Sequence, residues 1–188
     1  MIGYAFCGSF CTHQKSLEKL KELKQKYKDV LPIISENAAN TDTRFGSSAE
    51  FIKKVTEICG QSPILTIKDA EPLGPKIKLD LLIISPCTGN TLAKLTNGIT
   101  DTCVTMAAKA HMRNSRPLLI SLASNDGLSA NLANIGKMMN KKSVFFVPMV
   151  QDDVEKKPHS LVADFDLLPM CAELALSQKQ MRPVFKTN

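Results

Sequence analysis

Short apolar runs, each followed by a longer segment of helical periodicity, recur along the chain and constrain its fold more than any other feature. The clearest run is 79–85 (Leu-Asp-Leu-Leu-Ile-Ile-Ser), and others lie at 2–7, 30–35, 117–122 and 143–147. Runs of this length and apolar character are typical of strands buried on both faces. Strands that alternate with helices form a mostly parallel sheet with helices on both sides.

The residue types of the core agree with this arrangement. The chain has 188 residues, of which 44% are hydrophobic and only 5% aromatic, with no Trp. An aliphatic core suits parallel strands covered by helices. The sequence therefore predicts a single doubly wound α/β domain, Rossmann- or flavodoxin-like, with three α/β/α layers. We expect one domain over 1–188, with 148–188 as a C-terminal extension packed on it.

Ligands of such sheets bind outside the carboxyl ends of the strands. Four predicted loops follow strands there: 8–12, 35–48, 86–90 and 123–127. We expect 36–46 to be an irregular polar loop, 64–67 a short strand, 86–89 a tight connection, and 161–178 a helix. The four loops are the places to search for a site.

Charge and cysteine content exclude several functions. The formal net charge is +6, much of it from lysines within 15–28 that are typical of a solvated helix face. Aromatic residues are too few there for nucleic-acid stacking, whereas a small anion or an acidic partner fits. The six cysteines form no CxxC pair, so we expect no metal site and a reduced, cytoplasmic protein. No apolar run is long enough to cross a membrane.

The first candidate site follows the first predicted strand. Gly8 permits close approach of the backbone, Ser9 and Thr12 supply hydroxyl groups, and a helix N-terminus presents free N–H groups. Together these features suit one phosphate group. A plain strand-to-helix turn capped by Ser9 or Thr12 explains the same residues.

The second candidate site lies where the buried strand ends, in Ser-Pro-Cys-Thr-Gly-Asn-Thr at 85–91. Gly89 lets the chain pass close to a planar ring, and Asn90 can both donate and accept hydrogen bonds. A capped helix is again the simpler interpretation, but two such loops at the strand ends of one sheet favour a ligand site.

Both loops resemble the homo-oligomeric flavin-containing cysteine decarboxylase family. The run 85–99 is similar to the family's Pro-Ala-Ser/Thr-Ala-Asn-Thr signature and to the Ala-Lys-Leu-Ala-Asn-Gly-Ile-Ala-Asp that follows it, and Cys7-Gly8-Ser9 is similar to its Thr-Gly-Ser. The resemblance implies FMN as cofactor and a trimer or dodecamer with the flavin at a subunit boundary. It places the cofactor at Gly8, Ser9, Ser35, Thr88, Asn90, Thr91, Ser124 and Asn125.

Further segments resemble one branch of that family, among them 41–46, 70–75, 106–114, 124–127 and 156–163. This branch implies a subunit of an oxidoreductase that converts a dihydropyridine dicarboxylate into the aromatic ring in the mother cell of a spore-forming bacterium. The hydride acceptor would be FMN here or NAD(P) on a dehydrogenase-like partner subunit. The substrate's carboxylates direct attention to Arg44, Lys109, Arg113 and Arg116, with Asn90 beside them. Arg44 is preferred because it lies on the long loop after the second predicted strand.

Two departures from the decarboxylases leave three functions open. The family's His after the second strand is missing from 37–48, and its Pro-x-Met-Asn-x-x-Met clamp is replaced at 123–129 by Ala-Ser-Asn-Asp-Gly-Leu-Ser. The chain is an FMN-using oxidoreductase subunit, a non-catalytic binding subunit with the same fold, or an independent decarboxylase, which these departures disfavour. His13, His111, His159 and Cys87 fit packing or surface positions better than catalysis, so the acid or base is unassigned.

Overall fold

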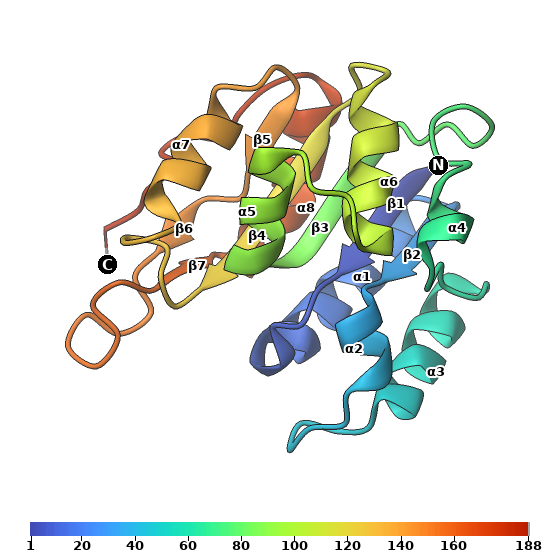
Figure 1. The fold of residues 1–188 in the computed structure, drawn as a ribbon, viewed down its shortest axis with the longest axis horizontal. Coiled ribbons are helices and arrows are strands. Elements are labelled where there is room, and N and C mark those ends of the chain that lie inside the picture. Colours follow the sequence, from blue (N-terminus) through green and yellow to red (C-terminus); the bar gives the residue numbers. More distant parts are fainter. Residues whose placement is uncertain (188) are drawn as a thin grey trace.

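The computed structural model describes residues 1–187, in which strands and helices alternate (Figure 1). The strands are β1 (Ile2–Phe6), β2 (Val30–Ile34), β3 (Leu81–Thr88), β4 (Leu118–Ser124), β5 (Val144–Phe146), β6 (Met149–Val150) and β7 (Leu161–Ala163). The helices are α1 (His13–Lys26), α2 (Glu36–Asn40), α3 (Ser48–Cys59), α4 (Ile67–Ala70), α5 (Gly89–Asn97), α6 (Cys103–Met112), α7 (Leu132–Met139) and α8 (Leu168–Leu176). Two 3₁₀ turns, η1 (Phe10–Thr12) and η2 (Phe165–Leu167), precede α1 and α8.

Within the described residues, the strands form one sheet in the order β2–β1–β3–β4–β7–β6, and β5 also pairs with β4. Strands β1 to β5 are parallel, whereas β7 is antiparallel to both β4 and β6. The strand order reverses direction between β1 and β3, which is the switch point where doubly wound sheets bind ligands. The predicted doubly wound α/β fold is confirmed, with a short antiparallel part added at one side.

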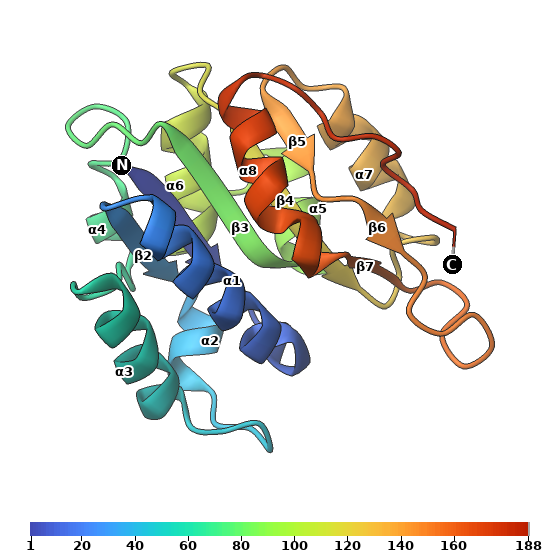
Figure 2. The same cartoon turned by 180° about the vertical axis from the view of Figure 1, so that it is seen from behind.

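The sheet separates two apolar cores because side chains alternate between its faces. Ile2, Tyr4 and Phe6 of β1 point to the face that α1, α3 and α8 cover, which Figure 2 shows. Ala5 and Cys7 point to the opposite face, under α5, α6 and α7 (Figure 1). The molecule therefore has three layers, with the sheet in the middle.

Four local expectations were wrong in part. Residues 36–40 form α2 because Ser35 caps the first turn, its Oγ accepting from the Ala38 N–H at 3.3 Å. Residues 64–67 make only one bridge to β2 before α4 begins.

The other two errors concern β3 and the C-terminal segment. β3 continues through 86–88 instead of ending in a tight connection, with a cis Ser85–Pro86 bond and a change of register between Ile84 and Cys87. Residues 161–163 form β7, and α8 starts only at Leu168. Main-chain pairing with Ala123 and Ser124 stabilises the strand there, which no local periodicity reveals.

Both outer sides of the sheet are covered by chain segments. Beside β2, the Ile64 N–H donates to the Pro32 carbonyl and the Ile64 carbonyl accepts from the Ile34 N–H, each at 2.9 Å. The Gln61 side chain adds a hydrogen bond to the Val30 carbonyl at 2.9 Å. The outer groups of β2 are therefore satisfied within the chain.

The far side is closed by the last residues of the chain. The Gln180 side-chain amide accepts from the Phe146 N–H at 2.8 Å and donates to the Phe146 carbonyl at 2.7 Å, as a neighbouring strand would. Met149 of β6 exchanges main-chain hydrogen bonds with Val184 and Lys186 at 2.8 and 2.9 Å. None of the helices in the described part of the chain combines the length and apolar character that a bilayer span requires.

Candidate functional site

The loop after β1 presents main-chain donors. In residues 1–187, the N–H groups of Gly8, Phe10 and Cys11 have no acceptor in the protein. The Ser9 side chain does not cap η1, and its Oγ accepts from the Thr12 hydroxyl at 3.1 Å. The Cβ that an alanine would carry at position 8 would lie no closer than 3.6 Å to other atoms, so space remains beside this loop. These groups suit an anion such as phosphate.

The end of β2 lies next to this loop. The Ser35 N–H donates to the Phe6 carbonyl at 2.9 Å, and its side chain caps α2. The neighbouring Glu36 Oε1 accepts from the Cys103 N–H at 2.8 Å, at the start of α6. Glu36 therefore satisfies a free donor of α6, and its buried Oε2 has no partner among the described residues.

The end of β3 lies on the other side of β1. Thr88 caps α5, its Oγ1 accepting from the Thr91 N–H at 3.2 Å. The Thr91 hydroxyl donates to the Cys7 sulfur at 3.3 Å, and the Cys7 N–H donates to the Pro86 carbonyl at 3.1 Å. The two predicted loops are thus joined at one edge of the sheet. Asn90, in the first turn of α5, is exposed and its side chain makes no hydrogen bond within residues 1–187.

A carboxylate network closes the end of β4. Asp126 accepts hydrogen bonds from the Ser124 hydroxyl and from Asn131 Nδ2, the latter at 3.0 Å to each carboxylate oxygen. The Ser124 bond is the larger influence that lowers the pKa of Asp126. Gly89 packs directly on the network: a Cβ there would lie 2.5 Å from Ser124 Oγ and from Asn131 Nδ2. Asn125 is exposed beside it.

This edge of the sheet gathers helix N-termini. η1 with α1, then α2, α5 and α6 all begin at or beside it, as the capping contacts of Ser35, Thr88 and Glu36 show. Helix N-termini carry partial positive charge and attract anions. The carboxylates of Glu36 and Asp126 reduce that charge locally, which leaves the loop of Gly8 as the better place for an anionic group.

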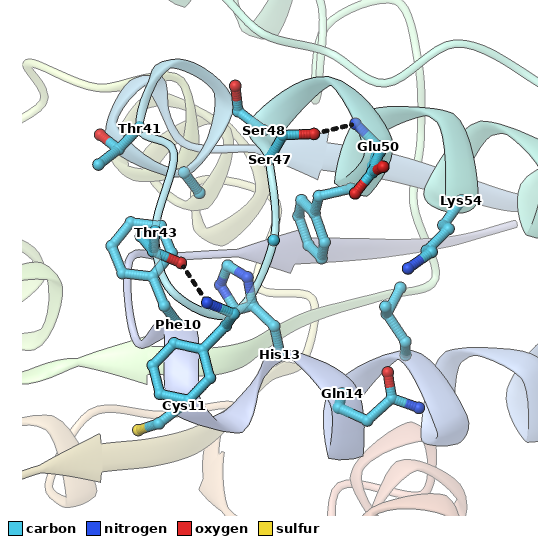
Figure 3. A pocket seen from close by; sticks show the side chains of 15 residues that line it. Phe10, Cys11, His13, Gln14, Thr41, Thr43, Ser47, Ser48, Glu50 and Lys54 are labelled. Atoms are coloured by element: carbon cyan, nitrogen blue, oxygen red, sulfur yellow. Dashed lines mark hydrogen bonds between the residues drawn. The ribbon is translucent and has the colours of Figure 1, made fainter.

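A hollow of about 300 Å³ adjoins this loop, between the start of α1 and the connection from α2 to α3 (Figure 3). Four rings line it: the His13 ring stacks on Phe51 with centroids 4.4 Å apart and meets Phe10 at 5.3 Å, and Phe45 is the fourth. The polar side chains of Gln14, Glu50 and Lys54 line it on the side away from Phe10 and Thr43 (Figure 3). The remaining lining residues are Cys11, Leu17, Ala38, Thr41, Thr43, Phe45, Gly46, Ser47 and Ser48.

His13 gives this hollow a defined polar group. One ring nitrogen, Nε2, lies 2.7 Å from the Cys7 carbonyl, so it carries the proton and donates. Burial lowers the pKa of His13, which keeps the ring neutral near pH 7. The other nitrogen, Nδ1, then offers a lone pair that no described residue uses. The hollow can therefore accept a hydrogen bond from a flat ligand.

The predicted carboxylate-binding residues do not lie together. Arg44 is exposed on the turn between α2 and α3, with its guanidinium 4.9 Å from the centre of the Phe45 ring. Lys109 lies in the last turn of α6 and Arg113 directly follows that helix, and both line a different hollow, away from the strand-end loops. Arg116 forms an ion pair elsewhere, so Arg44 is the only one of the four that lies in a connection following a strand of this edge.

The buried cysteines and the second buried histidine have structural roles. Burial raises the pKa of Cys7 to about 11 and that of Cys87 well above its ordinary value, so neither thiol forms a thiolate readily. His111 Nε2 donates to the Pro117 carbonyl at 2.8 Å. Within residues 1–187, no group of three His, Cys, Asp or Glu side chains is placed to hold a metal.

Sequence reasoning missed the aromatic wall of the hollow. Phe10, Phe45 and Phe51 are three of only eight Phe in the chain, and all three follow β1 or β2. Phe10 follows β1 directly, whereas Phe45 and Phe51 come from the connection to α3 and from α3 itself, so only the folded chain brings them together. The network partner Asn131 gave no sequence signal either, because it lies five residues beyond Asp126 in an irregular segment.

Comparisons with known proteins agree with this geometry. The flavoprotein family model matches residues 2–165. The B subunit of dipicolinate synthase from Bacillus subtilis (strain 168) is 43% identical over 187 residues, which cover 100% of this chain and 94% of the relative. The branch expected from the sequence, which contains this relative, is thereby confirmed.

Solved structures give the same result. The crystal structure of the dipicolinate synthase B subunit from Bacillus halodurans matches with a TM-score of 0.91 and 37% identity, over 100% of this chain and 96% of the other. A dodecameric FMN-dependent decarboxylase from Escherichia coli O157:H7 has a TM-score of 0.63 and 18% identity, over 78% and 79% of the two chains. At that identity the second match shows the fold alone.

Proposed function

This chain belongs to the flavoprotein family, and we propose that it is the B subunit of a dipicolinate synthase. In this role it helps to oxidise a dihydrodipicolinate ring to the aromatic dicarboxylate, in the mother-cell cytoplasm of a spore-forming bacterium. The observation that carries the proposal is the 43% identity to the Bacillus subtilis relative along the whole chain. The partner would be the dehydrogenase-like A subunit.

The loops at the strand ends fit the phosphate of FMN. The free N–H groups of Gly8, Phe10 and Cys11 and the hydroxyl of Ser9 would hold the phosphate, with Ser35 next to them. Thr88, Asn90 and Thr91 would face the ring, with Ser124 and Asn125 beyond them. When bound, FMN supplies a hydride acceptor, which no side chain can provide.

The substrate would contribute a flat ring and two carboxylates. Asn90 is exposed and can hydrogen-bond both the ring and a cofactor, and Arg44, on the connection from α2 to α3, would supply a guanidinium for a carboxylate. The aromatic hollow of His13 and Phe51 lies next to the phosphate loop and can receive the edge of a ring. These residues bind and orient, and none of them is assigned a proton transfer.

A non-catalytic binding subunit is a second candidate, and one observation favours it. The buried histidines near neutral pH already donate to main-chain carbonyls, and the thiols of Cys7 and Cys87 have raised pKa values. Apart from the unused Nδ1 lone pair of His13, these buried groups are not poised as bases, which agrees with chemistry and a hydride acceptor, NAD(P), on the A subunit. The proposal also includes a homo-oligomer, a trimer or dodecamer. In it, a second copy of the chain would complete the flavin site.

Reconstitution tests these candidates. The A subunit is expressed with and without this chain, and dipicolinate formation is measured from a dihydrodipicolinate-type substrate with NAD(P). Dipicolinate that appears only when both chains are present supports the proposed role, and unchanged synthesis without this chain contradicts it. Flavin absorption of the purified chain, or its uptake of added FMN, then separates the two candidates. A yellow protein supports the FMN-using subunit, and a colourless protein that takes up no FMN supports the non-catalytic binding subunit.

A further inference from the structure

A second hollow, of about 420 Å³, lies on the helical face in front of the sheet in Figure 1. It is formed by the end of α5, by α6 and by the connection from α7 to β5. Its apolar part consists of Leu95, Ile99 and Met112. The four cations that surround it are Lys109, Arg113, Lys141 and Lys142, and no acidic residue lines it.

The four cations are not neutralised by the protein. Among the described residues, none of them forms an ion pair, although nine pairs occur elsewhere in the same part of the chain. Asp101, the acidic residue nearest to Lys109 in the sequence, already pairs with Lys94 at 2.8 Å. Four like charges around one hollow repel one another, and a bound anion would relieve that repulsion.

Helix ends account for part of this charge. Lys109 lies in the last turn of α6 and Arg113 directly follows it, and Lys141 follows the end of α7, where cations are favoured by the partial negative charge of helix C-termini. That effect acts on each cation separately. The partial charge of helix ends does not explain why an apolar surface lies between the cations. It also does not explain why no carboxylate lines the hollow.

We propose that this hollow binds a planar aromatic dicarboxylate. The flat ring would lie on Leu95, Ile99 and Met112, while the carboxylates meet the cations at the rim, with Arg113 able to bind one of them through two hydrogen bonds. A hollow of about 420 Å³ is within the size range of small-molecule sites. The choice of ligand rests on the proposed function, whose product has this chemistry.

The position of the hollow sets it apart from the strand-end loops, so the role proposed for it is regulatory. The loops that would hold a cofactor lie at the carboxyl ends of the strands, whereas Lys109, Arg113 and Lys142 lie past the midpoint of α6 and beyond the end of α7. A dicarboxylate bound here does not meet a hydride acceptor at the strand ends. The fraction of hollows occupied would instead rise with the concentration of the aromatic product.

The test is a calorimetric titration of the purified chain with pyridine-2,6-dicarboxylate at low salt. We expect binding, and the double variant Lys109→Gln/Arg113→Gln should lower the affinity by about tenfold or more, since two charge-assisted contacts are lost. The control, Lys53→Gln/Lys68→Gln, removes the same net charge from exposed positions on α3 and α4 and should bind as the unchanged protein does.

Two further ligands separate this site from general attraction to a basic protein. Benzoate, with one carboxylate, and succinate, with two but no ring, should each bind more weakly than the pyridine dicarboxylate. The proposal is overturned if the pyridine dicarboxylate does not bind, or if the control variant loses as much affinity for it as the Lys109/Arg113 variant does. Equal affinity for all three ligands would overturn it too. If the cations only stabilise helix ends, the Lys109/Arg113 variant will unfold at a lower denaturant concentration but bind the pyridine dicarboxylate with unchanged affinity. That result also overturns the proposal.

The outcome is independent of the reconstitution experiment. The titration uses the isolated chain and needs neither FMN nor the A subunit. Dipicolinate synthesis without binding at this hollow contradicts the regulatory site alone. Binding here by a chain that does not support synthesis contradicts the proposed function alone.

Discussion

The two hollows attract ligands by opposite means. At the strand-end edge, helix N-termini and unpaired N–H groups around Gly8 supply positive charge from the main chain, and the neighbouring hollow is walled by rings. At the α6 hollow, the helices end, their carbonyls carry partial negative charge, and positive charge comes only from side chains such as Lys109 and Arg113.

This difference follows from the fold and has a consequence for substitution. Main-chain donors are set by the fold and survive most side-chain changes, so the strand-end edge is altered mainly by disturbing its packing or its caps. The α6 hollow depends on individual side chains, which substitutions remove without disturbing the fold. Effects on stability should therefore be large at the first place and small at the second.

The largest effect is expected from Gly89→Ala. The new Cβ would lie 2.5 Å from Ser124 Oγ and Asn131 Nδ2, and those side chains are held by Asp126. Overpacking of this kind should cost about 3 kcal/mol of unfolding free energy, the upper part of the usual range. Chemical denaturation with a constant m-value measures it.

Gly136→Ala is the matched control. Gly136 lies in α7 with open space around its missing Cβ. Alanine there should stabilise the protein by up to about 1 kcal/mol, because glycine is the poorer helix former. Equal destabilisation by both substitutions would mean that Gly89 is not specially packed at the strand-end edge.

Asp126→Asn should have the next largest effect, about 2 kcal/mol at neutral pH, since hydrogen bonds to a charged acceptor are lost. Because the folded state lowers the pKa of Asp126, its contribution is present above the ordinary Asp pKa and disappears as the pH falls through the folded value. Denaturation at several pH values should show a shallower acid limb for the variant. A variant as stable as the parent at every pH would show that the network does not stabilise this edge.

Loss of a helix cap should cost about 1 kcal/mol. Thr88→Ala removes the acceptor for the Thr91 N–H, and Thr102→Ala removes one half of the reciprocal cap with Thr105. Thermal unfolding of both variants measures the effect. Lys109→Gln, at the other hollow, is the comparison and should change stability by less; a larger loss there would contradict the contrast between the two regions.

The smallest effect concerns two imidazoles, His13 beside the strand-end edge and His111 on α6. Burial lowers the pKa of each, the hydrogen bond of each ring to a main-chain carbonyl opposes this in part, and for His111 the nearby Arg116 lowers it further. The unfolded chain then binds a proton at a higher pH than the folded chain, so stability falls as the pH drops below about 6.5.

The corresponding variants, His13→Gln and His111→Gln, should each weaken this fall, by at most about 1.4 kcal/mol per unit of pKa difference. Proton NMR of the two rings during a pH titration gives the pKa values directly. Ordinary pKa values for both rings would show that burial does not govern this part of the acid response.

Local pattern predicted the parallel strands because each is a short, mainly apolar run and all but β5 are followed by a helix. It could not predict β7, whose residues pair with Ala123 and Ser124 some forty positions earlier in the chain. The strand-end loops were likewise visible as Gly8-Ser9 and Thr88-Asn90, because small and hydroxyl residues follow apolar runs. The aromatic hollow and the four-cation hollow were not, since each joins segments that only the folded chain brings together.

The covered margins of the sheet limit how copies of this protein can associate. Gln61 and Ile64 occupy the polar groups beside β2, and Gln180 occupies those of β5. A second copy cannot extend the sheet by adding a strand without first displacing these segments. Any ring or shell of subunits would then be assembled through helices and loops, with interfaces made of side chains.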